Sequence, residues 1–305
     1  MSAVAIQCLA AARADAERLG GRLGIPVHQI AQHRFPDGEI AVTVGPAAPT
    51  TILYVPLDQP NEKLLTILFA AEALRRGGCT RLVLLAPYLS YMRQDAAFHP
   101  GEAISQKAVG RLLASVVDRV ITVDAHLHRT ASLGDVFPCI EADDLSAMPA
   151  IAASFRAHPL DPDTVVVGPD AESQQWVDAL AKLIDRRSTV ARKIRRGDRS
   201  VEVRFDDPSL IAGRPALLVD DIVSSGGTLI ACSKALHAAG ATWVDAVITH
   251  ALFPTSMLRE LAFAGLRSIR STHTVPHFTN GIVLDDLFAE TLRSEIGTIT
   301  KETRA

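Results

Sequence analysis

The stretch LLVDDIVSSGGTL, residues 217–229, decides how this chain folds around its most informative site. The apolar residues 216–219 predict a buried strand, which the acids Asp220 and Asp221 close. A loop of small residues at 224–228 comes next, and the helical apolar pattern that follows it stops at Gly240. This order places the N-terminus of a helix beside the end of a strand, which is a typical anion-binding arrangement.

The chemistry of this loop predicts a sugar phosphate as its ligand. Glycines allow backbone N–H groups to approach a phosphate, hydroxyls add donors, and the start of a helix carries a partial positive charge. Ionised carboxylates only accept hydrogen bonds, so Asp220 and Asp221 suit the hydroxyls of a sugar. The alternative is an ordinary strand-to-helix turn, but two acids and S-S-G-G-T exceed what a turn needs. The predicted site consists of Asp220, Asp221, Ser224, Ser225, Gly226, Gly227 and Thr228.

Short apolar strands alternate with helical patterns along the whole chain. The candidate strands are 51–56, 81–86, 119–123, 164–167, 216–219 and 244–250. The candidate helices are 10–19, 62–76, 105–116, 173–183, 228–239 and 256–264. This order predicts an α/β fold with parallel sheets flanked by helices. The pattern A-L-x-x-x-G-x-T begins at Ala73 and again at Ala235, which suggests two similar domains, at residues 1–146 and 147–305.

Composition excludes several classes of protein. The 305 residues include 31 Lys plus Arg against 34 Asp plus Glu, and this balance excludes a generally basic nucleic-acid binder. The four cysteines are far apart and form no C-x-x-C pair, so they predict reduced thiols in a cytoplasmic protein. The N-terminus lacks the pattern of a signal peptide, and no apolar run approaches the roughly 18 residues of a membrane helix. We therefore expect no nucleic-acid or membrane partner.

Two motifs in the first half of the chain carry candidate ligand residues. F-P-D-G-E at 35–39 predicts a tight turn, and a turn alone is its simplest interpretation. Y-M-R-Q-D at 91–95 follows a predicted strand, and the carboxyl ends of parallel strands form the ligand-binding edge of a sheet. Arg93 can bind a phosphate and Gln94 can hydrogen-bond a base edge, while a solvated loop is the alternative.

Acids and histidines follow two other predicted strands. Asp124, His126 and His128 alternate, so they would share one face if the strand continued through them. Their spacing would suit zinc, but no third or fourth soft ligand is evident, and His128 can equally be a solvated side chain. A magnesium site with one histidine and a carboxylate fits phosphate chemistry better. Asp170, after the strand at 164–167, is a candidate ligand for a metal ion or a ribose.

A basic run lies between a predicted helix and the next predicted strand. Its seven cations are Arg186, Arg187, Arg192, Lys193, Arg195, Arg196 and Arg199. Because like charges repel one another in an ordinary loop, we interpret the run as a mobile hairpin that closes on a polyphosphate. The balanced net charge and the lack of interleaved aromatic residues disfavour a nucleic-acid patch, and a solvated charged face is the remaining alternative.

Together these motifs resemble the PRPP synthetase (ribose-phosphate pyrophosphokinase) family, in which PRPP is 5-phosphoribosyl-1-diphosphate. The resemblance spans residues 35–250, whereas phosphoribosyltransferases share only the motif at 220–228. It implies two similar type I phosphoribosyltransferase-like domains, each with a mostly parallel sheet flanked by helices. The chain departs from the family pattern at Glu172-Ser173, where a pair of glycines is common, and in its catalytic loop, which is nearer to that of archaeal-type members.

The resemblance also implies roles for individual residues. The ATP-binding residues would be Phe35, Asp37, Gly38, Glu39, Arg93, Gln94, Asp95 and His126. His126 and Asp170 would hold Mg²⁺, and Lys193 and Arg195 would be catalytic. Arg195 would also contact ribose 5-phosphate, together with the sugar-phosphate site at 220–228.

The implied reaction converts ATP and D-ribose 5-phosphate into PRPP and AMP, with Mg²⁺ as cofactor. The resemblance further implies a homo-oligomer, dimeric or dimer-based, in which adjacent subunits share the ATP site. One alternative is a phosphoribosyltransferase that uses PRPP, which needs neither the ATP motifs nor a second domain. The other is a catalytically inactive regulatory relative, which has no need of the cationic hairpin.

Overall fold

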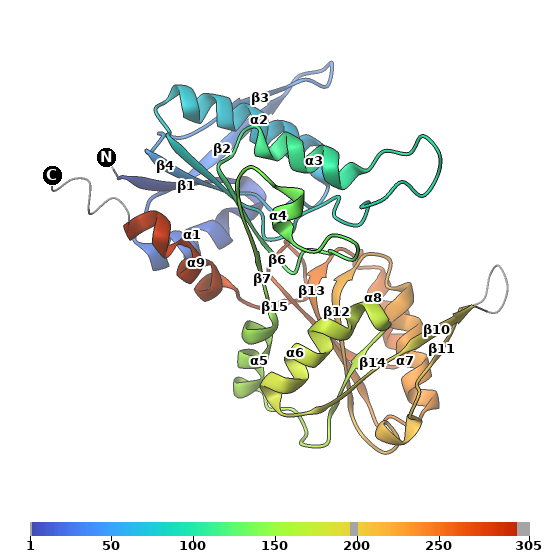
Figure 1. Ribbon diagram of the computed structural model, residues 1–305. Coiled ribbons are helices and arrows are strands. Elements are labelled where there is room, and N and C mark those ends of the chain that lie inside the picture. The colour runs from blue at the N-terminus through green and yellow to red at the C-terminus, as the bar shows by residue number, and fades with distance from the viewer. Residues whose placement is uncertain (1, 196–200, 298–305) are drawn as a thin grey trace. The chain divides into compact units, whose positions relative to one another are not determined.

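The computed structural model describes residues 2–195 and 201–297, which form two compact units (Figure 1). The first unit runs to Leu145 and also includes Thr274–Pro276 and the segment from Leu284 through the last described helix. The second unit comprises Ser146–His273 and His277–Val283. The last helix therefore departs from the predicted domain range of 147–305, because it packs on the first unit.

The first unit is built on a seven-stranded sheet of order β3-β2-β1-β4-β5-β6-β7. All neighbouring strands are parallel except β2 and β3, which form an antiparallel hairpin. In Figure 1, α2 and α3 cover one face of the sheet, and α1 and α9 cover the other. The strands are β1 (Val4–Leu9), β2 (Val27–Arg34), β3 (Ile40–Thr43), β4 (Thr50–Tyr54), β5 (Arg81–Leu85), β6 (Arg119–Val123) and β7 (Glu141–Leu145). The helices are α1 (Arg13–Leu23), α2 (Pro60–Arg76), α3 (Ser105–Ala114), α4 (Leu133–Val136) and α9 (Asp285–Gly297).

The second unit is built on a six-stranded parallel sheet of order β15-β14-β13-β12-β8-β9, beside which lies an antiparallel ribbon of β10 and β11. Helices α5 and α6 pack together, as do α7 and α8. The strands are β8 (Val165–Gly168), β9 (Arg187–Val190), β10 (Arg192–Arg195), β11 (Val201–Arg204), β12 (Ala216–Val223), β13 (Val244–Ala251), β14 (Leu266–Thr272) and β15 (Asn280–Ile282). The helices are α5 (Met148–Ala157), α6 (Gln174–Ile184), α7 (Gly227–Ala238) and α8 (Met257–Phe263).

Each sheet reverses its winding direction at one place. In the second unit the chain leaves β8 toward β9 on one side, and it later adds β12, β13 and β14 on the other. Open parallel sheets bind ligands beyond the carboxyl ends of the strands at such a reversal. The loops after β8 and β12, which carry Asp170 and residues 224–228, flank this point of the second sheet.

The predicted fold class of two similar α/β domains with mostly parallel sheets is confirmed. The internal repeat that suggested it corresponds to one structural feature, a shared helix end. After α2, the N–H of Cys79 donates to the carbonyl of Leu74 at 3.0 Å, and Gly78 adopts a φ of 99°. After α7, the N–H of Ala241 donates to the carbonyl of Leu236 at 3.0 Å, and Gly240 adopts a φ of 90°. The repeated glycines thus terminate both helices in the left-handed conformation that glycine adopts most easily.

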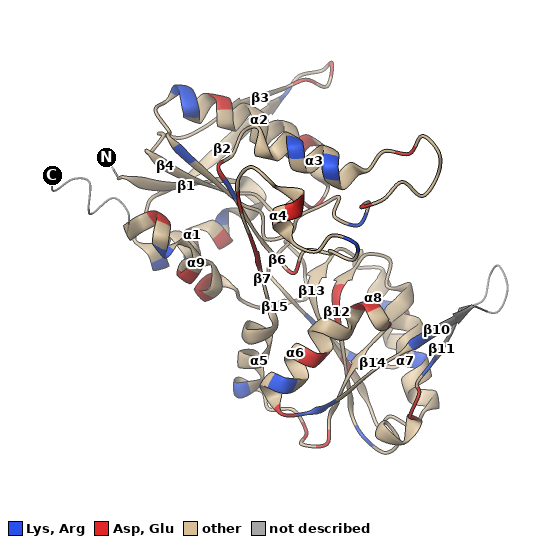
Figure 2. Cartoon of the chain, in the orientation of Figure 1, with Lys and Arg blue, Asp and Glu red and all other residues tan. Residues whose placement is uncertain are grey.

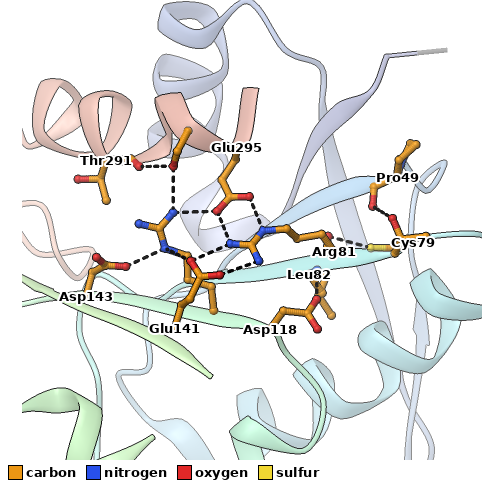
Figure 3. A network of polar contacts seen from close by, with 12 residues as sticks. Pro49, Cys79, Arg81, Leu82, Asp118, Glu141, Asp143, Thr291 and Glu295 are labelled. Atoms are coloured by element: carbon orange, nitrogen blue, oxygen red, sulfur yellow. Dashed lines mark hydrogen bonds and ion pairs between the residues drawn. The ribbon is translucent and has the colours of Figure 1, made fainter. Parts of the chain in front are cut away.

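An ion network around the buried residues Arg119 and Glu295 attaches α9 to the first unit (Figure 3). Glu295, on α9, accepts a hydrogen bond from Arg81 at 2.6 Å and one from Arg119 at 2.8 Å. Arg81 also binds Glu141 at 3.0 Å, and Arg119 binds Asp143 at 2.7 Å. Burial alone would raise the pKa of Glu295, but the two arginines outweigh burial and hold the pKa below its usual value. The network therefore joins the first residues of β5, β6 and β7 to α9.

Candidate functional site

The loop between β12 and α7 presents unsatisfied donors at a helix N-terminus. Helix α7 begins at Gly227, and the structure records no protein acceptor for the backbone N–H of Gly227 or Thr228 within its described residues. The side chains of Ser224 and Ser225 are exposed on the same loop. These donors, with the partial positive charge of the helix start, form a cradle for a phosphate.

Gly226 fixes the conformation of this loop on the side that packs against α8, and it does not face the open side of the loop. Its φ of 71° lies in the left-handed region, and a Cβ built on it would lie 2.9 Å from Cγ of Met257 on α8. A Cβ on Gly227 would meet only the hydroxyl oxygen of Ser225, at 3.8 Å. Gly226 is therefore required by backbone conformation and packing, while Gly227 faces the open side of the loop.

The two acids before the loop lie within the strand. The sequence predicts that they close it after Val219, but β12 continues to Val223, because its register with β13 extends to the pair of Val223 and Ala251. Asp221 is buried, and Asp220 is partly buried. Burial raises the pKa of Asp220 well above its usual value, and the carboxylates of Asp221 and Asp170 raise it further. Hydroxyl donors or a cation at this place would relieve that repulsion.

Asp170 occupies a tight turn after β8. Its carboxylate accepts the N–H of Glu172 at 3.1 Å, and the buried Ser173 donates its hydroxyl to the carbonyl of Asp170 at 2.6 Å. The residues that replace the common glycine pair therefore hold the turn that carries Asp170. In the second unit, the charges of Asp170 and Asp221 therefore both act on Asp220 and raise its pKa.

The corresponding loop of the first unit, between β4 and α2, lacks a phosphate cradle. It too has a left-handed residue before its helix, Gln59, with a φ of 47°. Pro60 starts the helix and has no N–H to offer. Lys63 donates to the carbonyl of Pro56 at 2.8 Å and to Asp58 at 2.5 Å. Of the two equivalent loops, the one at 224–228 is therefore the loop suited to a phosphate.

The cations of the basic run belong to several structural elements, and not to one hairpin as the sequence suggests. Arg186 donates to the carbonyls of Ile184 and Asp185 at the end of α6, so it caps a helix and is not part of a hairpin. Arg187 lies in the edge strand β9, and Arg192 begins β10 and pairs with Asp206 at 2.7 Å. Figure 2 shows that basic and acidic residues are spread over elements of both units.

The two predicted catalytic residues lie on the hairpin itself. Lys193 and Arg195 are in β10, opposite Val203 and Val201 of β11. Their side chains lie outside the described part of the structure, as do Arg196 and Arg199 entirely.

Residues 35–39 form the turn between β2 and β3. The N–H of Phe35 donates to the carbonyl of Glu39 at 2.8 Å, the N–H of Glu39 donates to Asp37 at 3.1 Å, and Gly38 has a φ of 95°. The predicted tight turn is thus present, and the ring of Phe35 is 41% exposed. In Figure 1 the hairpin projects beyond the rest of the sheet.

The predicted residues at 93–95 differ in their availability to a ligand. The exposed Arg93 has no ion partner among the described residues. Gln94 donates its amide to Glu102 at 2.7 Å, which lowers the pKa of that carboxyl. Asp95 binds the guanidinium of Arg129 at 2.8 Å. Arg93 is therefore the residue of this motif that is free to bind an anion, whereas Gln94 and Asp95 hold loops together.

The strand β6 ends at Val123, so the alternation predicted for the residues after it does not apply. Asp124 has a φ of 39°, which is incompatible with a continuing strand. Even so, His126 and His128 meet. Their Nε2 atoms are in contact and their ring centroids lie 3.8 Å apart. His128 is exposed, as the solvated interpretation expects, and its ring also contacts that of His126.

Sequence reasoning missed the residues that support these loops. Met257 underlies Gly226, Glu102 fixes Gln94, and Arg129 binds Asp95. In the sequence, the signal for such a contact is a charged residue near a motif that needs a partner, and this signal does not identify the partner. His126 and Asp170 belong to different units, so their joint role in holding a metal ion stays a prediction.

Comparisons with known proteins agree on one family. The profile described as the N-terminal domain of ribose phosphate pyrophosphokinase matches residues 4–116, and the phosphoribosyl transferase domain matches residues 149–262. A ribose-phosphate pyrophosphokinase of Methanopyrus kandleri is 31% identical over 262 residues, covering 85% of this chain and 88% of its own. Ribose-phosphate pyrophosphokinase 2 of Archaeoglobus fulgidus is 31% identical over 91% of this chain and 96% of its own.

A solved structure gives the same result for the fold. The crystal structure of phosphoribosylpyrophosphate synthetase from Mycobacterium smegmatis superposes with a TM-score of 0.83 at 25% sequence identity. The match covers 97% of this chain and 100% of that one. The similarity therefore includes both units, and not the phosphoribosyl transferase domain alone.

Proposed function

This chain belongs to the ribose-phosphate pyrophosphokinase family, and we propose that it transfers the diphosphate of ATP to D-ribose 5-phosphate. The oxygen of the ribose C1 hydroxyl attacks the β-phosphorus, the bond between that phosphorus and the oxygen of the α-phosphate breaks, and the hydroxyl proton leaves to solvent. The products are PRPP and AMP. The observation that carries the proposal is the donor cradle after β12 next to the carboxylates of Asp220 and Asp221.

The cradle supports binding of the 5-phosphate. The free N–H groups of Gly227 and Thr228 and the hydroxyls of Ser224 and Ser225 are donors that a phosphate can accept from. The carboxylates of Asp220 and Asp221 would then accept hydrogen bonds from the ribose hydroxyls. This division of charge orients the sugar with its phosphate at the helix and its ring at the acids.

Positioning and charge stabilisation account for most of the catalysis of such transfers. We assign the charge that develops between nucleophile and leaving group to Lys193 and Arg195, which both lie in β10. Arg93, exposed and without an ion partner in the described chain, would bind the phosphates of ATP.

The residues present suit Mg²⁺. Asp170 supplies the oxygen donor that Mg²⁺ prefers, and its charge raises the pKa of Asp220, which a bound cation would counteract. Asp170 and His126 would hold the ion, whose chemistry is to neutralise charge on the diphosphate. Asp170 is the better donor of the two, because imidazole is a weaker match for this cation.

A second copy of the chain would complete the ATP site. The turn at 35–39 follows β2, which lies three strand positions from β5 in the sheet order. At about 4.8 Å per position, this separates the turn from the loop of Arg93 by about 14 Å within one chain. Mixing two variants with weakened ATP binding, Asp37→Ala and Arg93→Ala, should restore the wild-type KM for ATP at some sites of the hybrid oligomers. Hybrids in which no site regains that KM would place both residues in one chain's site.

One assay tests the proposed reaction. Formation of AMP from ATP and Mg²⁺ should require ribose 5-phosphate and should match the PRPP produced. A phosphoribosyltransferase would release no AMP from ATP, and a regulatory relative would show neither product. Either result would reject the proposal.

The four cysteines are free, which supports a cytoplasmic location for the enzyme.

A further inference from the structure

His126 and His128 are brought together by a turn in the backbone. The N–H of Leu127 donates to the carbonyl of Ala125 at 2.7 Å, which closes a three-residue turn with His126 at its centre. This turn folds the chain back, so that the two rings meet at 84° with their Nε2 atoms in contact. The juxtaposition follows from local backbone geometry, and it lies wholly within the first unit.

The loop that carries the two rings is fixed on both sides. Before them, the N–H of Asp124 donates to the carbonyl of Leu145 at 2.8 Å, and the N–H of Ala125 donates to Asp144 at 2.9 Å. After them, the N–H of Arg129 donates to Asp95 at 3.2 Å. A ligand that binds both rings therefore does not have to order the backbone, and this preorganisation favours affinity.

The neighbouring charge does not oppose a cation. Arg129 directly follows the pair, but its guanidinium binds Asp95 at 2.8 Å and lies over the ring of Phe98, 5.4 Å from its centroid. Its positive charge is thus balanced by a carboxylate on another loop. His128 is exposed and His126 is partly exposed, so the pair lies at a solvent-accessible surface.

Two convergent imidazoles select one class of ion. Mg²⁺ takes oxygen ligands and keeps several waters, whereas imidazole nitrogen suits Zn²⁺, Ni²⁺ and Cu²⁺. At Zn–N distances of about 2.0–2.1 Å, a tetrahedral ion holds two nitrogens about 3.3 Å apart. Nitrogens already in contact reach that spacing by a small rotation of the rings.

We propose that His126 and His128 form a two-imidazole chelate for a borderline divalent transition-metal ion such as Zn²⁺, with water in the other coordination positions. This inference does not depend on the proposed function, because it concerns binding in the absence of ATP and ribose 5-phosphate. It gives His128 a role that the sugar-phosphate chemistry does not use.

Calorimetric titration of the full-length protein with Zn²⁺, without substrates, tests the chelate. The wild type should bind one Zn²⁺ that excess Mg²⁺ does not displace. His126→Gln and His128→Gln should each weaken this binding by at least about tenfold, since each removes one ligand. His158→Gln, at an exposed histidine after α5, is the matched control and should leave the affinity unchanged.

Two results would overturn the chelate. One is unchanged affinity in either His126→Gln or His128→Gln, and the other is equal weakening in His158→Gln, which would indicate scattered surface binding. If a variant does not fold, imidazole NMR of the wild type decides, because Zn²⁺ should shift the Nε2 resonances of both rings together. A protein that fails this test and still forms AMP from ATP and ribose 5-phosphate would lose the chelate and keep the proposed function.

Discussion

Replacement of Gly227 by valine should remove ribose 5-phosphate binding without unfolding the protein. Gly227 is the first residue of α7, and a Cβ there meets only the Ser225 hydroxyl, at 3.8 Å, so the added methyls enter the open side of the loop. They would block the N–H groups of Gly227 and Thr228. A hydrogen bond to a charged group contributes about 1.5–3 kcal/mol, so losing two should raise KM for ribose 5-phosphate about 100- to 10,000-fold.

The neighbouring glycine provides the matched control. Gly226→Val places a branched side chain at a φ of 71° and against Met257, which should cost about 2–5 kcal/mol of stability from backbone strain and overpacking. Gly227→Val should lower stability by less than about 1 kcal/mol. Rates of AMP formation at varied ribose 5-phosphate and thermal unfolding of both variants separate these effects. A Gly227→Val enzyme with the wild-type KM would refute the phosphate assignment of this loop.

Three further predictions concern single side chains. Arg93→Ala should raise KM for ATP about tenfold or more and KM for ribose 5-phosphate little, by loss of a charge-assisted contact to one substrate, and equal changes would contradict the assignment. Lys193→Ala should lower kcat by a factor of about 10²–10³ and leave both KM values nearly unchanged. The control, Lys182→Ala on the exposed side of α6, should be neutral in the same assay. Normal turnover in Lys193→Ala would remove the catalytic assignment. Glu295→Gln should cost about 3 kcal/mol in urea unfolding at neutral pH, since it leaves Arg119 without a buried partner. Folding lowers the pKa of Glu295, so its contribution to the free energy of unfolding is complete above the ordinary pKa of 4.5 and is lost as the pH falls through the pKa of the folded state. The stabilities of wild type and variant should therefore converge in acid. A stability difference that does not change with pH would contradict this linkage.

Much of each sheet could be predicted from local pattern, because a buried parallel strand is a short apolar run. The predicted strand at 119–123 coincides with β6, and the predicted strand at 81–86 differs from β5 by one residue. The strand β1 was missed. It contains the buried Gln7, whose amide binds the carbonyl of Pro46 at 3.2 Å and the N–H of Gly45 at 3.0 Å. A polar residue satisfied by a segment nearly forty positions away has no local signature.

The same distinction applies to the candidate site. The phosphate loop at 224–228 is contiguous, so its glycines and hydroxyls could be recognised in the sequence. The meeting of His126 and His128 depends on a three-residue turn, and residue spacing alone does not predict that turn. Likewise, Asp95 reads as a ligand from its motif, but the structure pairs it with Arg129, thirty-four residues later. Contacts of this kind depend on tertiary folding.

The position of α9 sets an order for folding during synthesis. The first unit contains β1 to β7, yet its helix α9 follows the entire second unit in the sequence. Until then Arg81 and Arg119 cannot bind Glu295, and α1 has no α9 to pack against. Domains usually fold in the order in which they leave the ribosome. Here the second unit, which is inserted within the first, can complete its sheet while the first still waits for its final helix.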